Sequence, residues 1–290
     1  MKVAVIIAST GRPVELARWV DHCTRQSQSP VELIFSIASL ADLPPGFADH
    51  RARVHIGPKG SAHQRNTGLQ NLQSDAEIVA FFDDDYVPSH RCIEGIVATF
   101  AADAGIVAAS GTLLADGINS PGVDFDTAMA MVTRFDASHA APDVSSIPAM
   151  GTYGCNMAFR REGIGDIRFD ERLPLYAWQE DVDFSRRLRG RGRIVASKAF
   201  VGVHQGVKSG RTPGLRFGYS QVANPLYLIR KGTMPVSAAL WLMTRNILSN
   251  HVKALRPEPW VDRTGRMAGN WRALGDLVRG RLQPERILSL

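Results

Sequence analysis

Short apolar runs alternate with amphipathic stretches through the first half of the chain. Apolar, β-branched runs predict strands at residues 2–8, 31–38, 53–56, 77–83 and 106–114. Helical periodicity lies between them, at residues 14–25, 61–72 and 92–102. Strands that alternate with helices in this way are typical of an α/β fold. We therefore expect a doubly wound unit with a parallel sheet up to about residue 115.

The second half of the chain is less regular. Between about residues 115 and 149, Gly, Pro, Asp and Ser are scattered, and we expect a long loop or flap. Regular elements return at residues 151–160, followed by a helix at 180–189 and a late strand at 194–203. Helical stretches then follow at residues 219–230, 236–255 and 271–282. The expected division is a main domain of residues 1–212 and a helical C-terminal appendage of residues 213–290.

Composition indicates a globular protein with a basic surface. The 290 residues are 44% hydrophobic, which is enough for a substantial core. The formal charge of +6 favours an anionic partner, which could be nucleic acid, a membrane surface or a phosphorylated substrate. Basic residues are concentrated at 186–193 and from Arg245 onward. We interpret them as a side of the protein that faces an anionic membrane surface, the alternative being a solvated basic face. No aromatic-and-basic recognition motif accompanies the charge, so we set nucleic acid aside.

Cysteine usage and the apolar runs bear on the compartment. Cys23, Cys92 and Cys155 are widely spaced, which favours neither a disulfide framework nor a thiolate zinc site, and a reducing cytoplasm fits them. The apolar run at the N-terminus is short and lacks a cleavage-type segment, so we interpret it as a first strand, not a signal peptide. The later run at residues 236–243 falls well short of the roughly 20 residues of a spanning helix, and none is expected.

Three adjacent carboxylates, Asp83, Asp84 and Asp85, directly follow a predicted buried strand. Open α/β sheets bind ligands at the carboxyl ends of their strands. Adjacent carboxylates repel one another and are costly to bury, and a hard divalent cation offsets their charge. Because Mg²⁺ uses few protein carboxylates and fills its other positions with water and phosphate oxygens, the cluster suggests a metal that bridges to a diphosphate. The alternative is an acidic turn that closes the strand, aided by Pro88 and Ser89.

Five motifs follow one another along the chain: Ile7–Pro13, Ala62–Gly68, the aspartate cluster, Gly154–Arg160 and Trp178–Asp183. With these motifs in this order, the chain resembles the family 2 glycosyltransferases over roughly residues 2–210. The resemblance implies the GT-A fold, a Rossmann-like nucleotide-diphospho-sugar transferase domain whose mixed sheet is flanked by helices. It also implies inverting transfer, of hexosyltransferase type, from a nucleotide-diphosphate sugar, usually with Mn²⁺ or Mg²⁺. By the same resemblance, residues 1–115 form the nucleotide-binding half and residues 150–212 the acceptor half.

Inverting transfer needs a base for the acceptor hydroxyl and cationic help for the departing diphosphate. The family pattern maps the base to Asp181, with Glu180 positioning the acceptor or assisting. A carboxylate at a helix start is also a common cap, and that alternative stays open for Asp181. Trp178 offers an aromatic face for a sugar. The remaining acceptor-side candidates from the resemblance are Gly154 and Asn156.

The resemblance also assigns the donor side. Asp85 is the metal carboxylate, and Asp83 and Asp84 face the nucleotide and the ribose or donor sugar. His204 follows the last strand, where the family often has a second metal residue, although a lone His is more often structural.

Polar residues of the first two motifs complete the predicted donor site, and each has a structural alternative. Arg65 and Asn66 face the donor near its diphosphate or form a helix-surface pair. Ser9, Thr10 and Arg12 stand at the end of the first strand. They line the nucleotide pocket or form a simple strand-to-helix turn. The second strand ends in Ile34–Ser39 without the carboxylate that reads uracil in many relatives. A uridine donor is the default, and guanosine or deoxythymidine donors stay open.

The tail suggests where the acceptor is found. The segment Leu240–Met243 with nearby basic residues resembles an interfacial amphipathic helix, the alternative being a helix packed on the main domain. Residues 269–287 resemble tails of bacterial enzymes that build surface polysaccharide on lipid carriers. We therefore expect a glycan or lipid-linked saccharide acceptor in exopolysaccharide or lipopolysaccharide assembly. The expected location is cytoplasmic and peripheral on the inner face of the cell membrane; no oligomeric state is predicted.

Two other functions stay open. A nucleotidyltransferase that forms sugar nucleotides also uses a doubly wound sheet and an acidic metal site, but the chain lacks an early Gly-rich phosphate loop that bears Arg and Lys. A non-catalytic nucleotide- or sugar-binding module is the third hypothesis. Complete acidic sites argue against it, because adjacent carboxylates are costly to hold together unless a metal or a reaction uses them.

Overall fold

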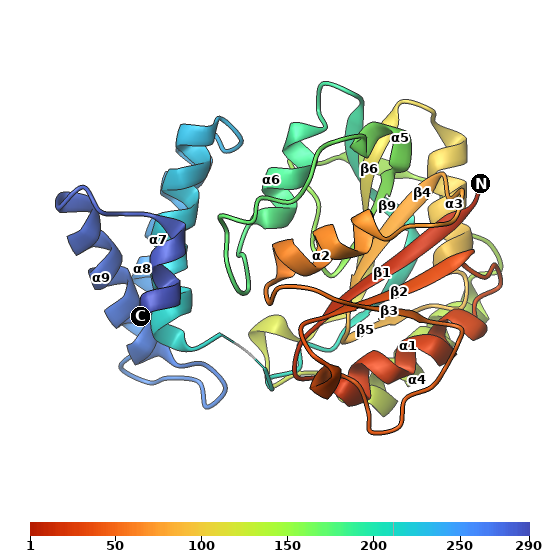
Figure 1. Cartoon of the computed structure of the whole chain (residues 1–290), viewed down its shortest axis with the longest axis horizontal. Helices are drawn as coiled ribbons and strands as arrows, with labels where there is room; N and C mark the ends of the chain where they lie inside the picture. Colours follow the sequence, from red (N-terminus) through yellow and green to blue (C-terminus); the bar gives the residue numbers. More distant parts are fainter. Residues whose placement is uncertain (211) are drawn as a thin grey trace.

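A nine-stranded mixed sheet runs through the first two thirds of the chain, and helices cover both of its faces (Figure 1). The computed structural model describes residues 1–210 and 212–290. The strands lie in the order β3-β2-β1-β4-β8-β6-β9-β5, and β7 pairs with β9. Their bounds are β1 Val3–Ser9, β2 Glu32–Ile37, β3 Arg53–Ile56, β4 Ile78–Asp83, β5 Tyr86–Pro88, β6 Ile106–Asp116, β7 Ser146–Pro148, β8 Asn156–Arg160 and β9 Arg193–His204.

Strand direction brings several chain segments to one edge of this sheet. The four strands β3, β2, β1 and β4 are parallel, as the alternating pattern predicts. Strand β8 is antiparallel to both of its neighbours, β4 and β6, so its first residue Asn156 lies opposite Phe82 near the end of β4. Strand β9 is parallel to β6 and pairs His204 with Asp116. The ends of β4, β6 and β9 and the start of β8 therefore meet at the same edge.

Two apolar cores hold the helices against the sheet. On one face, Trp19 and Phe100 pack with Phe82, and on the other, Phe184 packs with Phe159. Helices α1 and α3 cover the first face, and α2, α5 and α6 cover the second. The helices are α1 Pro13–Thr24, α2 Ser61–Gln70, α3 Cys92–Ala102, α4 Phe125–Ser138, α5 Arg161–Ile164, α6 Glu180–Arg187, α7 Gly214–Lys231, α8 Val236–Lys253 and α9 Arg263–Val278, with 3-10 turns η1 Leu40–Asp42, η2 Gly117–Asn119 and η3 Pro284–Ser289.

The segment of residues 115–149, where the sequence suggests a long loop or flap without fixing its structure, contains regular elements. It includes α4, which begins after Asp124, whose side chain accepts a hydrogen bond from the Thr127 amide at 2.9 Å. Helix α4 covers the β5–β9 side of the sheet through Ala128 and Val132, which pack on Val203. Only these two residues of the helix are buried. A helix with so narrow a buried side leaves a weak apolar pattern in the sequence, which is why the pattern did not predict it.

Helices α7, α8 and α9 pack on one another beside the sheet, as a separate group of ribbons in Figure 1. The far end of α7 returns to the main body, where Leu228 and Met234 join the core around α6. Lys231 reinforces this contact because its ammonium pairs with Asp183 of α6 at 2.7 Å and also with Asp170. Within the described ranges 1–210 and 212–290, no helix has both the length and the apolar character to cross a membrane.

Close helix packing in the appendage rests on glycine. A Cβ atom placed on Gly218 of α7 would lie 2.1 Å from the backbone oxygen of Arg266 in α9. We expect Gly218→Ala to lower the free energy of unfolding by about 1–3 kcal/mol, because the two backbones must separate to admit the methyl group. Chemical denaturation measures this change. The matched control is Gly190→Ala, where a Cβ meets no atom within 4 Å and little change is expected; equal effects at both positions would contradict the packing argument.

Candidate functional site

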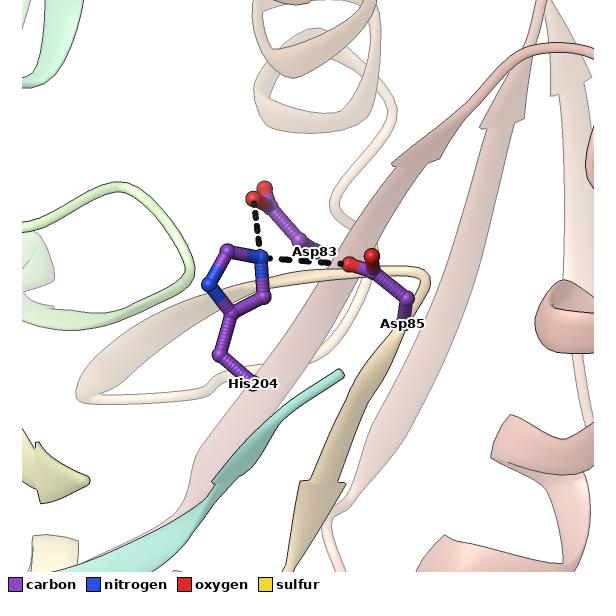
Figure 2. A group of neighbouring side chains, drawn as sticks. All are labelled: Asp83, Asp85 and His204. Atoms are coloured by element: carbon purple, nitrogen blue, oxygen red, sulfur yellow. Dashed lines mark ion pairs between the residues drawn. The ribbon is translucent and has the colours of Figure 1, made fainter. Parts of the chain in front are cut away.

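Two aspartates and a histidine converge where β4 and β9 end (Figure 2). Asp83 is the last residue of β4, Asp85 lies in the turn to β5, and His204 ends β9. One ligand atom from each lies within 4.8 Å of the others. His204 Nε2 is 3.4 Å from Asp85 Oδ1 and 4.0 Å from Asp83 Oδ2. The sequence predicts Asp85 and His204 as metal residues and assigns Asp83 to the nucleotide or donor sugar. The pairing of β9 with its neighbours brings all three together.

The donor atoms of this cluster fit a divalent cation. Asp85 is only 2% exposed, and its Oδ1 atom has no hydrogen-bond partner among the described residues. A buried carboxylate oxygen without a partner is costly unless another group uses it. Carboxylate oxygens suit Mg²⁺ and Mn²⁺, and imidazole nitrogen is a common additional metal ligand. Asp83, Asp85 and His204 are therefore the residues that could hold a metal ion.

The charges within the cluster are strongly coupled. Burial lowers the pKa of His204, but the hydrogen bond to Asp116 and the proximity of Asp85 raise it to about 10. Burial raises the pKa of Asp85, whereas His204, Arg12 and the Val207 amide outweigh that effect and hold it below its usual range. A protonated His204 thus offsets part of the negative charge, a role that a bound cation would also fill.

Asp116 is a functional candidate that the sequence did not identify. Its Oδ1 atom lies 2.8 Å from Nδ1 of His204, and its Oδ2 atom accepts a hydrogen bond from the Tyr153 hydroxyl at 2.9 Å. These contacts fix the imidazole ring so that Nε2 faces Asp83 and Asp85. A carboxylate at the end of a predicted strand is the one signal that could have drawn attention to Asp116.

A second group of predicted residues meets at the end of β1, where its members bind one another. Asp84 accepts hydrogen bonds from Ser9 Oγ at 2.6 Å and from Arg12 Nη1 at 2.8 Å. Arg12 also donates to the backbone oxygens of Val207 and Ser209, each at 3.0 Å. Burial raises the pKa of Asp84, while Arg12 and Ser9 oppose the shift. This group therefore ties the ends of β1 and β4 to the segment that follows β9.

Arg65 joins the metal-ligand candidates to the start of α6. It is 3% exposed, so it does not belong to a helix-surface pair. Its guanidinium pairs with Glu180 and lies 3.1 Å from Asp83 Oδ1. It also donates to the backbone oxygen of Gly154 at 3.2 Å. One buried cation thus aligns three segments that are far apart in the sequence.

Asp181, the predicted base, is held by backbone amides. Its Oδ2 atom accepts a hydrogen bond from Gly154 N, and its Oδ1 atom accepts one from Val182 N, both at 2.8 Å. Burial raises the pKa of this carboxyl, and the two amides and the charge of Arg65 oppose the rise. The N-cap position of α6 is Gln179, so Asp181 is not the cap.

The chain before α6 has an unusual backbone. Leu175, Ala177 and Gln179 have positive φ values of 59°, 50° and 77°. Side chains other than Gly rarely adopt this region, and such residues cluster where a surrounding structure fixes the backbone. The amide of Ser61 in α2 donates to the Leu175 carbonyl at 2.8 Å, which anchors this segment to the Arg65 helix. The approach to Glu180 and Asp181 is therefore set by contacts with α2.

Of four other candidates, three have contacts that lie apart from the acidic cluster, whereas Asn156 lies opposite Phe82 at the end of β4, next to Asp83. Asn66 donates to the Phe169 carbonyl at 3.0 Å and to Glu171, and Asn156 has no exposed surface. Thr10 donates to Gln64 at 3.1 Å. The Trp178 ring meets Phe217 of α7 edge-on, with centroids 5.9 Å apart.

The arrangement supplies two chemical capacities side by side. Asp83, Asp85 and His204 can hold a cation at the end of β4, and a carboxylate with a raised pKa, Asp181, stands at the start of α6. A cation can neutralise an anionic leaving group, and such a carboxylate can accept a proton.

Comparison with known proteins adds family information. The family model described as "Glycosyl transferase family 2" matches residues 4–167. No curated protein matches the sequence.

Solved structures share the fold. TarS from S. aureus has a TM-score of 0.56 at 13% identity, over 99% of this chain and 82% of that chain. Mannosyltransferase PcManGT from Pyrobaculum calidifontis, in complex with GDP-Man and Mn²⁺, has a TM-score of 0.51 at 18% identity, over 99% of this chain and 85% of that chain. GalNAc-T7, solved with UDP, GalNAc and Mn²⁺, has a TM-score of 0.52 at 12% identity, over 100% of this chain and 56% of that chain. At these identities the likeness concerns the fold.

Proposed function

This chain belongs to glycosyl transferase family 2, and we propose that it is an inverting, metal-dependent hexosyltransferase that moves a sugar from a nucleotide-diphosphate donor to a glycan or lipid-linked saccharide. The observation that carries the proposal is the Arg65 link between the Asp83–Asp85–His204 cluster and the pair Glu180 and Asp181. Proteins with this fold have been solved with GDP-Man and Mn²⁺ and with UDP-GlcNAc, which supports a nucleotide-sugar donor.

Asp181 is the proposed base. As the acceptor oxygen forms its bond to the anomeric carbon, Asp181 accepts the proton of that hydroxyl, and the bond from the carbon to the diphosphate oxygen breaks on the opposite face. The two amides that bind Asp181 fix the direction of its carboxylate, which favours proton transfer from one position. Glu180, held by Arg65, is proposed to position the acceptor.

Asp85, His204 and Asp83 are proposed to hold Mn²⁺ or Mg²⁺, which when bound would neutralise charge on the departing diphosphate. Ser9, Thr10, Arg12 and Asp84 border the donor side at the end of β1. The proposed donor contact of Arg65 is indirect, since its guanidinium is occupied by Asp83 and Glu180.

Residues 1–212 are proposed as the catalytic domain, with a nucleotide-binding half at 1–115 and an acceptor half at 150–212. Residues 213–290 are the proposed appendage. The contact between Trp178 and Phe217 supports an acceptor site that extends to α7. We place the protein in surface-polysaccharide assembly, on the cytoplasmic side of the cell membrane.

Calorimetric titration with UDP, GDP and dTDP tests the donor class. We expect one of the three nucleotides to bind in the presence of Mn²⁺ and to lose most of its affinity when a chelator is added, because the metal neutralises the diphosphate charge. The nucleotide that binds then directs a search over sugar donors. Absence of binding by all three, with and without Mn²⁺, would contradict the proposed function.

A further inference from the structure

Large apolar side chains are exposed along the outer side of the appendage. Trp241 of α8 is 62% exposed and Trp271 of α9 is 61% exposed, although Trp is mostly buried in folded proteins. Val278 at the end of α9 is 89% exposed. We call the following set the α8–α9 face: Leu240, Trp241, Leu248, Val252, Leu255, Trp271 and Val278.

Helical spacing places the α8 members of this face on one side. Trp241 and Leu248 are seven residues apart, and Val252 follows after four more, so the three side chains project in similar directions. The opposite side of α8 is already partnered, since Ala239 packs in the core of the main domain and Met243 in that of the appendage. Helix α8 therefore has an inner side that packs and an outer side that does not.

The stripe on α9 adjoins the stripe on α8. The His251 ring of α8 meets the Trp271 ring of α9 edge-on, with centroids 5.7 Å apart. Deeper in the bundle, Asn250 donates to Gln221 of α7 at 2.8 Å and to Asn270 of α9 at 2.9 Å. These buried bonds fix how the three helices pack, so the outer side chains of α8 and α9 form one continuous surface.

The charge around this surface has one sign. Residues 184–257 contain fourteen Lys and Arg and no Asp or Glu, and residues 213–290 contain twelve Lys and Arg against four Asp and Glu. Those four acids are engaged: Glu258, Asp276 and Glu285 form ion pairs, and Asp262 caps α9. Among the described residues of the appendage, six exposed arginines form no ion pair, namely Arg230, Arg245, Arg256, Arg272, Arg279 and Arg281.

We propose that the α8–α9 face docks onto an anionic lipid bilayer. Exposed Trp and Leu insert at the level of the headgroups, and unpaired arginines attract anionic lipid at short range. The guanidinium of Arg245 lies 4.6 Å above the Trp241 ring, so one site offers both interactions. A second copy of the chain fits less well, because a symmetric contact would set these arginines against one another. The inference deepens the membrane location of the proposed function, on which it rests, but lipid binding itself needs no sugar transfer.

Vesicle flotation of the full chain tests the docking surface. The probes are phosphatidylcholine vesicles with and without phosphatidylglycerol, at low and high salt. We expect binding to the anionic vesicles only, weakened by salt, and about tenfold lower partitioning for Trp241→Ser and for Arg245→Glu. Val31→Ser, a substitution at a 47% exposed position directly before β2, is the matched control and retains wild-type partitioning.

Three results would overturn the proposal. The first is partitioning of Trp241→Ser and Arg245→Glu equal to that of wild type, and the second is no binding of wild type to anionic vesicles. The third is a dimer, measured by light scattering after gel filtration, that Trp241→Ser converts to monomer, because a second copy would then cover the face. Nucleotide binding is measured on the same variants, so a loss of lipid binding alone is distinguished from failure of the proposed enzyme.

Discussion

Asp181→Asn is expected to lower the rate of sugar transfer by about 10²–10⁴-fold while donor binding persists. The amide side chain keeps the size of the carboxylate but cannot accept the acceptor proton. It also cannot accept hydrogen bonds from both Gly154 N and Val182 N, which costs about 1–3 kcal/mol of stability but leaves the donor-side residues in place. Steady-state rates with saturating donor measure the loss of transfer, and calorimetric titration measures whether donor binding persists.

Asp166→Asn is the matched control for this variant, because that carboxylate is 93% exposed and its partner is Arg191. Its rate should equal that of wild type. In wild type, transfer should decline on the acidic side at a higher pH than for an ordinary aspartate, since burial raises the pKa of Asp181 and only the deprotonated form accepts a proton. A variant Asp181→Asn that transfers sugar at the wild-type rate would exclude Asp181 as the base.

Asp85→Ala is expected to reduce metal-dependent nucleotide binding by at least about 100-fold, because the variant lacks a candidate ligand and leaves His204 to pair with Asp83 and Asp116 alone. Titration of nucleotide with Mn²⁺, compared with the same titration in chelator, measures the metal-dependent part. Asp75→Ala removes a 74% exposed carboxylate that pairs with Lys2 and should bind as wild type does. Equal Mn²⁺ dependence in Asp85→Ala and wild type would refute the metal assignment.

The family and the mixed α/β fold predicted from the sequence are confirmed by the match over residues 4–167 and by the solved structures of the same architecture. Where apolar periodicity is strong, the predicted bounds of an element lie close to the observed bounds. The helix predicted at 92–102 is α3, Cys92–Ala102, which buries six of its residues. Where burial is slight, the pattern failed, as in α4. Helix α9 begins at Arg263, earlier than predicted, because Gly265 and Gly269 resemble helix breaks until their close packing is seen.

The candidate site also contains residues that the sequence identified and contacts that it did not. The resemblance gave Asp85 and His204 as metal residues and assigned Asp83 to the nucleotide or donor sugar, whereas the structure brings all three within reach of one ion. The contact of Asp116 with His204 could not be predicted, because it joins positions 88 residues apart through the pairing of β6 with β9. The binding of Arg12 to the chain after β9 has the same origin. Such contacts depend on strand order, which a single sequence does not specify.

The left-handed residues before α6 have a consequence for engineering. Each positive φ at Leu175, Ala177 and Gln179 costs roughly 1 kcal/mol that Gly would avoid. A search for thermostable variants would favour Gly at Ala177 and Gln179, whereas Leu175 also packs on the core of the appendage and would lose that contact. Glycine would also widen the range of backbone angles open to the segment that carries Trp178. Under the proposed function, variants chosen for heat resistance at these positions should therefore be screened for acceptor selectivity, because a looser segment would hold the acceptor in a less defined position.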